Sequence, residues 1–332
     1  MILLDAIYIN NSGGKVLLDY LIEVIEGEAM DVFYLLDIRV KDNHPQIKSK
    51  NKILYSKSSL LVRHKFYLQN SNKFNKVLCF GNLPPSIKTT ATVYTYFHQK
   101  LFLEVPSDSS FKNKFIFFIK SLVFQYLKKN TSFWLVQTES MKSALNDKNI
   151  RNVTVIPFYP SLKLEEKRIK RKGVYIYVSS GAPHKNHLNL LDGFVKFYDK
   201  HKVGELHLTV SSEFNQLLFS IEKLVNQGYP IINHGFISRN KLAKLYGESQ
   251  YAIYPSLSES FGLGIIEALE KDCKIIGANL AYTYSVCEPS LVFNPKDVYS
   301  ILKIFELSLS NDVVESKQIV FNEINGLLKL LK

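Results

Sequence analysis

The sequence predicts an α/β protein built from two doubly wound parallel sheets. Its 332 residues exceed the usual size of one domain, so we expect two. Strand-like and helix-like runs alternate along both halves, and 46% of the residues are hydrophobic, which is enough for two cores. Residues 161–173 (SLKLEEKRIKRKG) are charged and lack apolar periodicity. We interpret this stretch as the interdomain linker, with domains at residues 1–162 and 163–332.

The first half opens with strand, turn and helix in that order. A strand is expected at residues 2–9, a glycine turn (NNSGG) at 10–14 and a helix at 16–25. Further apolar runs of strand length follow at DVFYLLD, KILYS, KVLCFG, TVYTYFH and FWLVQT. This order predicts parallel strands.

The second half repeats the pattern from residue 173 onward. Its expected strands are GVYIYVSS, ELHLTVS, IINHGF and YAIYP, and no antiparallel pairing is expected. Helices are expected at KLAKLYGES, after Gly264, and at NHLNLLDGFVKFY. One face of this last helix should carry Leu188, Leu191, Val195 and Tyr198. We expect the amphipathic C-terminal run FNEINGLLKLLK to pack back on the first domain.

Positive charge is concentrated in the first half. The net charge is +12, and residues 43–130 hold fifteen Lys or Arg against two acids, Glu104 and Asp108. Nucleic acid, an anionic membrane surface and phosphorylated substrates are all partners that such a segment suits.

Within the basic segment, residues 111–130 (FKNKFIFFIKSLVFQYLKKN) have helical periodicity. The apolar face would hold Phe111, Phe115, Ile119, Leu122 and Tyr126. This pattern fits a core helix of the first domain or an interfacial helix on an anionic membrane. Together with the surrounding charge, it favours a membrane over a nucleic acid.

Several absences narrow the function classes. The three cysteines include no C-x-x-C pair, which is typical of a reducing cytoplasm. The first apolar run contains Asp5 and does not read as a secretory signal, and no run of about 18 apolar residues occurs. The sequence has no D-x-D, H-E-x-x-H or G-x-S-x-G motif, which disfavours a metal-dependent transferase or a serine hydrolase.

Two carboxylates frame the stretch SLSESFGLGIIEALE at residues 256–270. Glu259 precedes Gly262 and Gly264, and Glu267 follows them inside a helix that should begin there. A helix start after a strand aims backbone N–H groups at a phosphate, and glycine lets a ligand approach the backbone. A carboxylate one turn further on can accept hydrogen bonds from sugar hydroxyls. Either glutamate alone fits a helix-dipole or solvated-loop role, but the combination indicates a ligand site.

The run PSLSESFGLGIIEALE resembles the E-x7-E segment of retaining glycosyltransferases of family four. These enzymes have the GT-B fold, in which two Rossmann-like domains face a cleft. The resemblance implies that Glu259 faces the donor hexose and that Glu267 binds the ribose of the nucleotide. It also implies that the backbone of Phe261, Gly262 and Leu263 approaches the sugar and the diphosphate.

A second motif, SSGAPHKN, follows the strand GVYIYV and places Lys185 at the start of a helix. A lone loop lysine is usually only solvated, but an ammonium beside helix amides can neutralise a leaving diphosphate. The family carries a Lys-Asn or Lys-Gly pair here, so the resemblance assigns Lys185 to the donor diphosphate. Many members have an Arg five residues earlier, where this chain has Ser180. We expect His184 or a first-domain residue to complete the diphosphate site around Ser180.

Two features of the first half are weak when taken alone. The turn NNSGGK is neither a G-x-G-x-x-G motif nor a P-loop, and a lone histidine beside aromatics, such as His98, is usually a packed residue. The resemblance implies that Gly13 and Gly14 approach the donor phosphates and the acceptor. It places His98 near the transferred sugar.

The resemblance implies a retaining, metal-independent glycosyltransferase that uses a nucleotide diphosphate sugar and no further cofactor. Lys185, Glu259 and His98 are its catalytic candidates. The acceptor would be a lipid-linked glycan of a bacterial surface polysaccharide such as an O-antigen or capsule. We expect the protein on the cytoplasmic face of an anionic membrane, with no nucleic-acid partner. The alternatives are a sugar-nucleotide epimerase on the same scaffold and a basic, non-enzymatic protein that binds nucleic acid or membranes.

Overall fold

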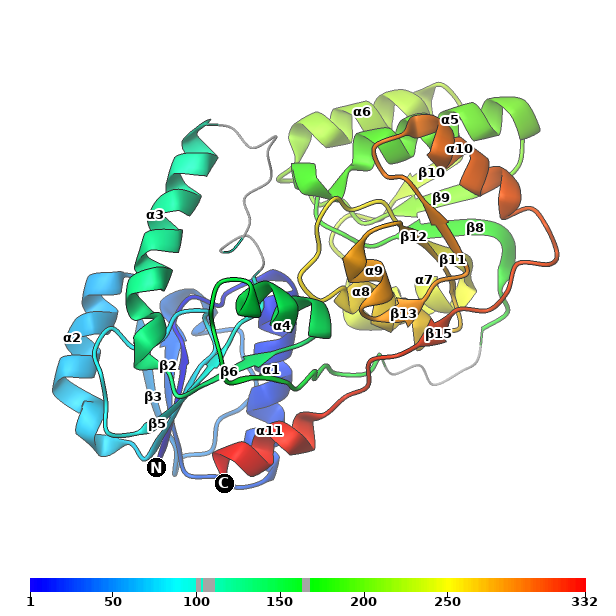
Figure 1. Ribbon diagram of the computed structural model, residues 1–332. Helices are drawn as coiled ribbons and strands as arrows, with labels where there is room; N and C mark the ends of the chain where they lie inside the picture. Colours follow the sequence, from blue (N-terminus) through cyan, green and yellow to red (C-terminus); the bar gives the residue numbers. More distant parts are fainter. Residues whose placement is uncertain (100–102, 104–110, 163–167) are drawn as a thin grey trace. The chain divides into compact units, whose positions relative to one another are not determined.

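The computed structural model describes residues 1–99, 103, 111–162 and 168–332. The chain forms two compact units (Figure 1). Unit 1 comprises Met1–Pro160 and Phe321–Lys332, and unit 2 comprises Ser161–Val320. Glu104, Asp108 and residues 163–167 of the predicted linker lie outside the described residues.

Unit 1 holds a seven-stranded sheet in the order β3-β2-β1-β4-β5-β6-β7, and all its strand pairs are parallel. The strands are β1 (Ile2–Ala6), β2 (Val32–Asp37), β3 (Lys52–Ser56), β4 (Lys76–Cys79), β5 (Thr92–Tyr96), β6 (Phe133–Val136) and β7 (Val153–Val155). The inner strands are buried on both faces, which explains their continuous apolar sequences.

The helices of unit 1 are α1 (Ser12–Gly27), α2 (Leu60–Asn70), α3 (Phe111–Leu127), α4 (Glu139–Asn146) and α11 (Ile324–Leu331). The expected glycine turn at residues 10–14 is largely wrong, because α1 begins at Ser12 with the extended residue Asn11 as its N-cap. The last helix, α11, belongs to unit 1 (Figure 1). The Lys76 ammonium donates to the carbonyl of Leu330 at 3.0 Å.

Unit 2 holds a six-stranded parallel sheet in the order β10-β9-β8-β11-β12-β14. These strands are β8 (Arg171–Tyr177), β9 (Glu205–Leu208), β10 (Ile231–Asn233), β11 (Ser249–Tyr254), β12 (Lys274–Ala278) and β14 (Leu291–Phe293). Its helices are α5 (His187–His201), α6 (Asn215–Asn226), α7 (Arg239–Glu248), α8 (Leu263–Leu269), α9 (Ala281–Tyr284) and α10 (Val298–Leu307). The prediction of two doubly wound sheets is confirmed, whereas the cleft between them stays a prediction.

Three details of unit 2 correct the sequence-based expectations. The strand β8 begins inside the predicted linker, because Arg171 pairs with Ser249 of β11. One short antiparallel pair is present, between β13 (Cys287–Glu288) and β15 (Lys317–Gln318). The predicted apolar face of α5 is only partly buried: Leu191 is buried but Leu188 is 59% exposed, and Phe194 and Phe197 make the contact with Phe305 of α10.

Candidate functional site

The candidate site residues of unit 2 lie where its strand order reverses. The strand β8 pairs with β9 on one side and with β11, which comes later in the chain, on the other. Because the strands are parallel, the loops at residues 178–186 and 255–262 leave the sheet at the same edge. In doubly wound folds, ligands bind at this switch point.

The structure brings two of the predicted catalytic residues together. The Lys185 ammonium donates to Oε1 of Glu259 at 2.6 Å, and both side chains are 16% exposed. The hydroxyl of Ser256 donates to the same oxygen at 2.7 Å. A cation and a carboxylate from two separate loops thus form one partly open polar site.

The backbone around Lys185 is held by three part-buried hydrogen bonds. Asn186 adopts a left-handed conformation with φ of 60°, and its amide donates to the carbonyls of Pro255 at 3.1 Å and Pro295 at 2.7 Å. The hydroxyl of Tyr177, at the end of β8, donates to the carbonyl of Lys185 at 2.9 Å. These bonds fix the loop that presents the ammonium, so the site is largely preorganised.

The helix α8 begins where the sequence predicted, immediately after Gly262. This glycine has φ of +78°, a conformation that L side chains rarely adopt, and it serves as the N-cap residue. The neighbouring Phe261 is buried, and Leu263 is the first helical residue. Gly264 also packs closely on Tyr254, because a Cβ there would lie 3.3 Å from the ring, while the predicted approach of a ligand to its backbone stays a prediction.

Glu267 meets a partner that the sequence did not suggest. Its buried carboxylate accepts a hydrogen bond from Nη1 of Arg239 at 2.6 Å. Arg239 is the first residue of α7 and follows the serine N-cap Ser238. Burial raises the pKa of Glu267, and the nearby guanidinium opposes that rise. The only sequence signal for the Arg239–Glu267 pair was the position of Arg239, which closely follows the predicted strand IINHGF.

Ser180, which stands where many family members have an arginine, is exposed. Burial and the Lys185 charge lower the pKa of the neighbouring His184, which makes its imidazole a weak source of positive charge. Completion of the diphosphate site by His184 or by a first-domain residue stays a prediction. Arg239, which pairs with Glu267, is a further cation of unit 2.

In unit 1 the structure brings Gly14 and His98 together. A Cβ on Gly14 would lie 3.9 Å from Nε2 of His98. Gly13 and Gly14 belong to the first turn of α1, and His98 follows β5, where its backbone N–H donates to the side-chain oxygen of Asn82 at 2.7 Å. Burial lowers the pKa of His98 to about 4, so the ring is neutral at pH 7.

Three neutral polar atoms at the carboxyl edge of the unit 1 sheet are buried without hydrogen-bond partners in the described structure. They are Tyr8 Oη, His98 Nδ1 and Gln137 Nε2. They follow β1, β5 and β6 respectively. Buried polar groups are normally paired, so three such atoms at strand ends indicate a place for a polar ligand. Sequence reasoning missed Tyr8 and Gln137, which look like ordinary core residues.

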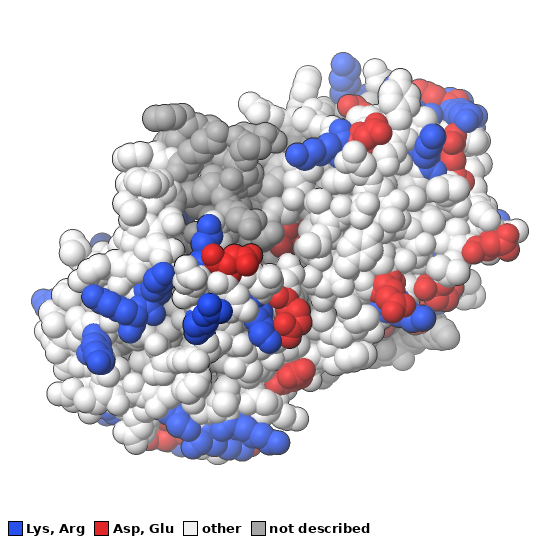
Figure 2. Space-filling view, in the orientation of Figure 1, with Lys and Arg blue, Asp and Glu red and all other residues white. Residues whose placement is uncertain are grey.

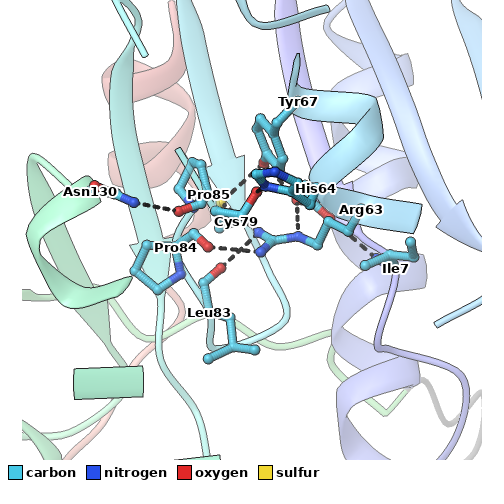
Figure 3. Close-up of polar contacts among 11 residues, drawn as sticks. Ile7, Arg63, His64, Tyr67, Cys79, Leu83, Pro84, Pro85 and Asn130 are labelled. Atoms are coloured by element: carbon cyan, nitrogen blue, oxygen red, sulfur yellow. Dashed lines mark hydrogen bonds and ion pairs between the residues drawn. The ribbon is translucent and has the colours of Figure 1, made fainter. Parts of the chain in front are cut away.

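A buried charged network supports this edge of unit 1 (Figure 3). Arg63 of α2 donates from Nε to Asp5 at 2.7 Å, and both side chains are at most 2% exposed. Its other nitrogens donate to the carbonyls of Leu83 at 2.9 Å and Pro84 at 2.7 Å. The network anchors the loop after β4, which also carries the Asn82 that binds His98.

The helix α3 exposes most of its predicted apolar face. Exposure ranges from 45% to 65% for Phe115, Ile119, Leu122 and Tyr126. The core contact is instead made by Phe124 and Leu127, and Phe124 packs on Trp134. The core-helix interpretation is therefore wrong for these four residues, while the side chain of Phe111 lies outside the described part. On the face shown in Figure 2, Lys and Arg predominate over unit 1, whereas basic and acidic side chains are mixed over unit 2.

No helix among the described residues is long and apolar enough to cross a membrane.

Comparison with known proteins links unit 2 to one family. Residues 161–310 match the family model of glycosyl transferases group 1. The serotype-specific mannosyltransferase WbdA of Escherichia coli is 31% identical over 83 residues, which are 25% of this chain. The match spans only 10% of that relative's length.

Solved structures resemble nearly the whole chain. Sucrose-phosphate synthase from Thermosynechococcus elongatus superposes with a TM-score of 0.74 at 14% identity, covering 93% of this chain and 90% of that one. The lipopolysaccharide outer core galactosyltransferase WaaB superposes with a TM-score of 0.66 at 15% identity, covering 94% of this chain and 90% of that one. Anabaena HepE in complex with UDP and glucose superposes with a TM-score of 0.66 at 12% identity, covering 93% of this chain and 89% of that one. At these identities the likeness shows the fold, which is the predicted GT-B fold.

Proposed function

We propose that this chain, whose residues 161–310 match the family model of glycosyl transferases group 1, transfers a hexose from a nucleotide diphosphate sugar to a glycan hydroxyl, with retention at the anomeric carbon. The observation that carries this proposal is the Lys185–Glu259 pair, 2.6 Å apart at the switch point of unit 2. The second carboxylate, Glu267, lies five residues into α8. One site thus offers a cation for a diphosphate and separate carboxylates for two sets of hydroxyls.

In the proposed reaction Lys185 stabilises the departing diphosphate, together with backbone N–H groups around Gly262. Glu259 accepts hydrogen bonds from the transferred hexose, and Glu267 accepts them from the ribose. Lys185 supplies positive charge where a divalent cation would otherwise act, so we propose that neither a metal nor a further cofactor takes part. The complex of the structural neighbour HepE with UDP and glucose supports a donor of this kind.

Unit 1 contributes neutral groups to the proposed reaction. His98 has a pKa of about 4, so at pH 7 it can donate or accept a hydrogen bond without carrying charge. Such a group suits a sugar hydroxyl better than a phosphate. We therefore assign His98 and the backbone at Gly13 and Gly14 to the hexose and the acceptor.

We further propose that the acceptor is lipid-linked and that the protein binds the cytoplasmic face of an anionic membrane. The exposed apolar side of α3 lies within a strongly basic segment, which suits an anionic interface. WbdA is a serotype-specific mannosyltransferase, and WaaB is a galactosyltransferase of the lipopolysaccharide outer core. They support surface polysaccharide assembly as the setting.

Thermal-shift titration with UDP-, GDP- and dTDP-sugars tests the central proposal. A ligand that binds only the folded state at 100 times its Kd adds about 2.7 kcal/mol of stability, which is readily detected. With the best donor, the hexose should move only when a glycan acceptor is present. Conversion of the donor without an acceptor would instead indicate an epimerase. If oligonucleotides alone stabilised the protein, with a steep salt dependence, the proposal would be wrong.

Vesicle flotation tests the membrane proposal separately. The protein should float with phosphatidylglycerol vesicles and not with phosphatidylcholine vesicles. Replacing Leu122 and Tyr126 with glutamate should abolish flotation, because two charges would then enter the apolar interface. The control Leu307→Glu changes an exposed leucine of α10 in unit 2 and should float like the unmodified protein. Equal flotation of all three proteins would contradict docking through α3.

A further inference from the structure

Unit 2 contains a pocket beside the Lys185–Glu259 site, at the carboxyl ends of β11, β12 and β14. Its volume is about 330 Å³, and it is partly open to solvent. The lining residues are Leu257, Asn279, Leu280, Asn294, Pro295 and Lys296. Small-molecule sites span roughly 300–1,000 Å³, so this pocket suits one small ring or a fragment of a larger ligand.

The pocket lining combines apolar surface with hydrogen-bond donors. The side-chain oxygen of Asn279 accepts from the hydroxyl of Tyr284 at 2.8 Å, and that of Asn294 accepts from the backbone N–H of Lys296 at 3.1 Å. Both asparagines therefore keep their amino groups for other partners. The ammonium of Lys296 makes no ion pair or hydrogen bond with any residue that the structure describes. Carboxylates are absent from this lining.

The pocket wall is joined to the loop that carries Lys185. The carbonyl of Pro295 accepts from the Asn186 amide at 2.7 Å and from the Asn189 amide at 3.1 Å. The backbone N–H of Leu257 donates to the carbonyl of His184 at 2.8 Å. Leu257 also lies only two residues before Glu259. The pocket is therefore held rigidly next to the groups proposed to act on the donor.

We propose that this pocket is a subsite for a pyranose ring, either the hexose of the donor or a sugar of the acceptor glycan. The inference rests on the proposed function. Leu257, Leu280 and Pro295 offer apolar surface to the C–H groups of a ring. The amino groups of Asn279 and Asn294 and the ammonium of Lys296 donate to its hydroxyl oxygens. The subsite gives this chain a way to select a sugar in addition to Glu259.

Two variants and two sets of probes test the subsite. Leu280→Trp fills the pocket, and Asn294→Ala removes one donor. The donor probes are UDP-, GDP- and dTDP-hexoses compared with the corresponding nucleotide diphosphates, measured by calorimetry. The acceptor probes are the methyl α-pyranosides of glucose, galactose and mannose, measured by saturation-transfer difference NMR. Loss of one or two hydrogen bonds should weaken binding about tenfold.

The two sources of the ring give different outcomes. If the donor hexose occupies the pocket, both variants bind the nucleotide hexose about tenfold more weakly and the nucleotide diphosphate normally. If an acceptor sugar occupies it, both variants bind nucleotide hexoses normally and lose the methyl glycoside signal. Normal binding of the nucleotide diphosphate also shows that the site of Asn294→Ala is folded.

A matched control is Leu307→Trp, which adds the same bulk at a position 57% exposed on α10. It should bind every probe as the unmodified protein does. If Leu280→Trp also binds every probe normally, or if the unmodified protein shows no sugar-dependent binding, the subsite is overturned. If the unmodified protein binds methyl glycosides in this pocket but no nucleotide hexose, the proposed function fails while the subsite stands.

Discussion

The two units use the same strand order to present different kinds of polar group. In each sheet the first strand of the unit, β1 or β8, is a central strand. The next two strands of the chain lie on one side of it, and the later strands lie on the other side. At the carboxyl edge of unit 2 the candidate side chains are charged and paired, Lys185 with Glu259 and Arg239 with Glu267. At the same edge of unit 1 the side chains of Tyr8, His98 and Gln137 are neutral, and each has one buried polar atom without a hydrogen-bond partner among the described residues.

Unit 1 also has a charged pair, but its position in the fold is different. Arg63 and Asp5 are at most 2% exposed, and Arg63 also donates to backbone carbonyls of the loop after β4. Lys185 and Glu259 are each 16% exposed. The Arg63–Asp5 pair of unit 1 therefore supports structure, whereas the Lys185–Glu259 pair of unit 2 is accessible to a ligand. Topology sets where a site forms, and the side chains at the strand ends decide its chemistry. We infer that unit 2 suits an anionic donor and that unit 1 suits neutral hydroxyl groups.

The largest expected effect comes from breaking the buried pair of unit 1. Arg63→Met leaves Asp5 charged and buried, and it leaves the carbonyls of Leu83 and Pro84 without their donor. Removing one partner of a buried ion pair typically costs about 3–5 kcal/mol. Trp134 is the only tryptophan and lies in unit 1, so its fluorescence during urea unfolding reports the stability of that unit.

The control for this prediction is Lys142→Met, which removes the cation of an exposed pair with Glu139 in the same unit. Such pairs contribute about 0–1 kcal/mol, so the urea midpoint should barely move. Equal midpoints for the two variants would show that Arg63 has no special structural role.

The second prediction concerns the paired charges of unit 2. Lys185→Ala should lower kcat about 100- to 1000-fold, because one preorganised group that stabilises the leaving diphosphate is lost. Steady-state kinetics with the best nucleotide sugar measures this, and the stability of unit 1 followed by Trp134 should stay unchanged. The matched control is Lys200→Ala, which removes an exposed lysine of α5 that pairs with Glu306 at 2.6 Å. Normal turnover by Lys185→Ala would overturn the site assignment.

The fold was predictable from the sequence because its signals are local. Buried parallel strands read as apolar runs, and the start of α8 follows from glycine at residue 262, whose φ of +78° favours that residue type. The short strands β7 and β14 have only three residues each, too few for a periodic signal.

The partners of the site residues were not predictable, because the fold brings them together from distant parts of the chain. Arg239 lies 28 residues before Glu267, and Arg63 lies 58 residues after Asp5. In the sequence Arg63 is one more cation in a basic segment, and nothing local distinguishes it from a surface residue. The unpaired atoms of Tyr8 and Gln137 likewise become notable only once their surroundings are known.

The third prediction tests whether Arg239 positions Glu267. Arg239→Ala should weaken binding of the nucleotide diphosphate about 10- to 100-fold, because a charge-assisted hydrogen bond of roughly 1.5–3 kcal/mol is lost. The loss should be greater at pH 6 than at pH 8. Burial already raises the pKa of Glu267, and without the guanidinium the carboxylate takes up a proton more readily as the pH falls.

Calorimetry at the two pH values measures this effect, and Arg239→Lys should restore part of the affinity. Arg171→Ala provides the control, since it removes an exposed arginine that pairs with Glu205 at 3.0 Å in the same unit. An affinity loss that is equal at both pH values, with no rescue by lysine, would argue against positioning through charge.

The remaining prediction separates the acid stability of the two units. His187 of unit 2 is buried against Tyr177, and burial lowers its pKa to about 3, from about 6.5 in the unfolded chain. Between these values the unfolded state binds more protons, so the stabilisation present above about pH 6.5 is lost as the pH falls toward 3. The free energy of unfolding changes by at most about 1.4 kcal/mol per pH unit through this group.

His187→Gln should flatten the pH dependence of unfolding followed by far-UV circular dichroism. The unit 1 transition followed by Trp134 fluorescence should keep its own dependence, because His98, with a pKa of about 4, remains in place. Flattening of both transitions would show that the units unfold as one body, and an unchanged circular dichroism profile would show that His187 does not titrate in this window.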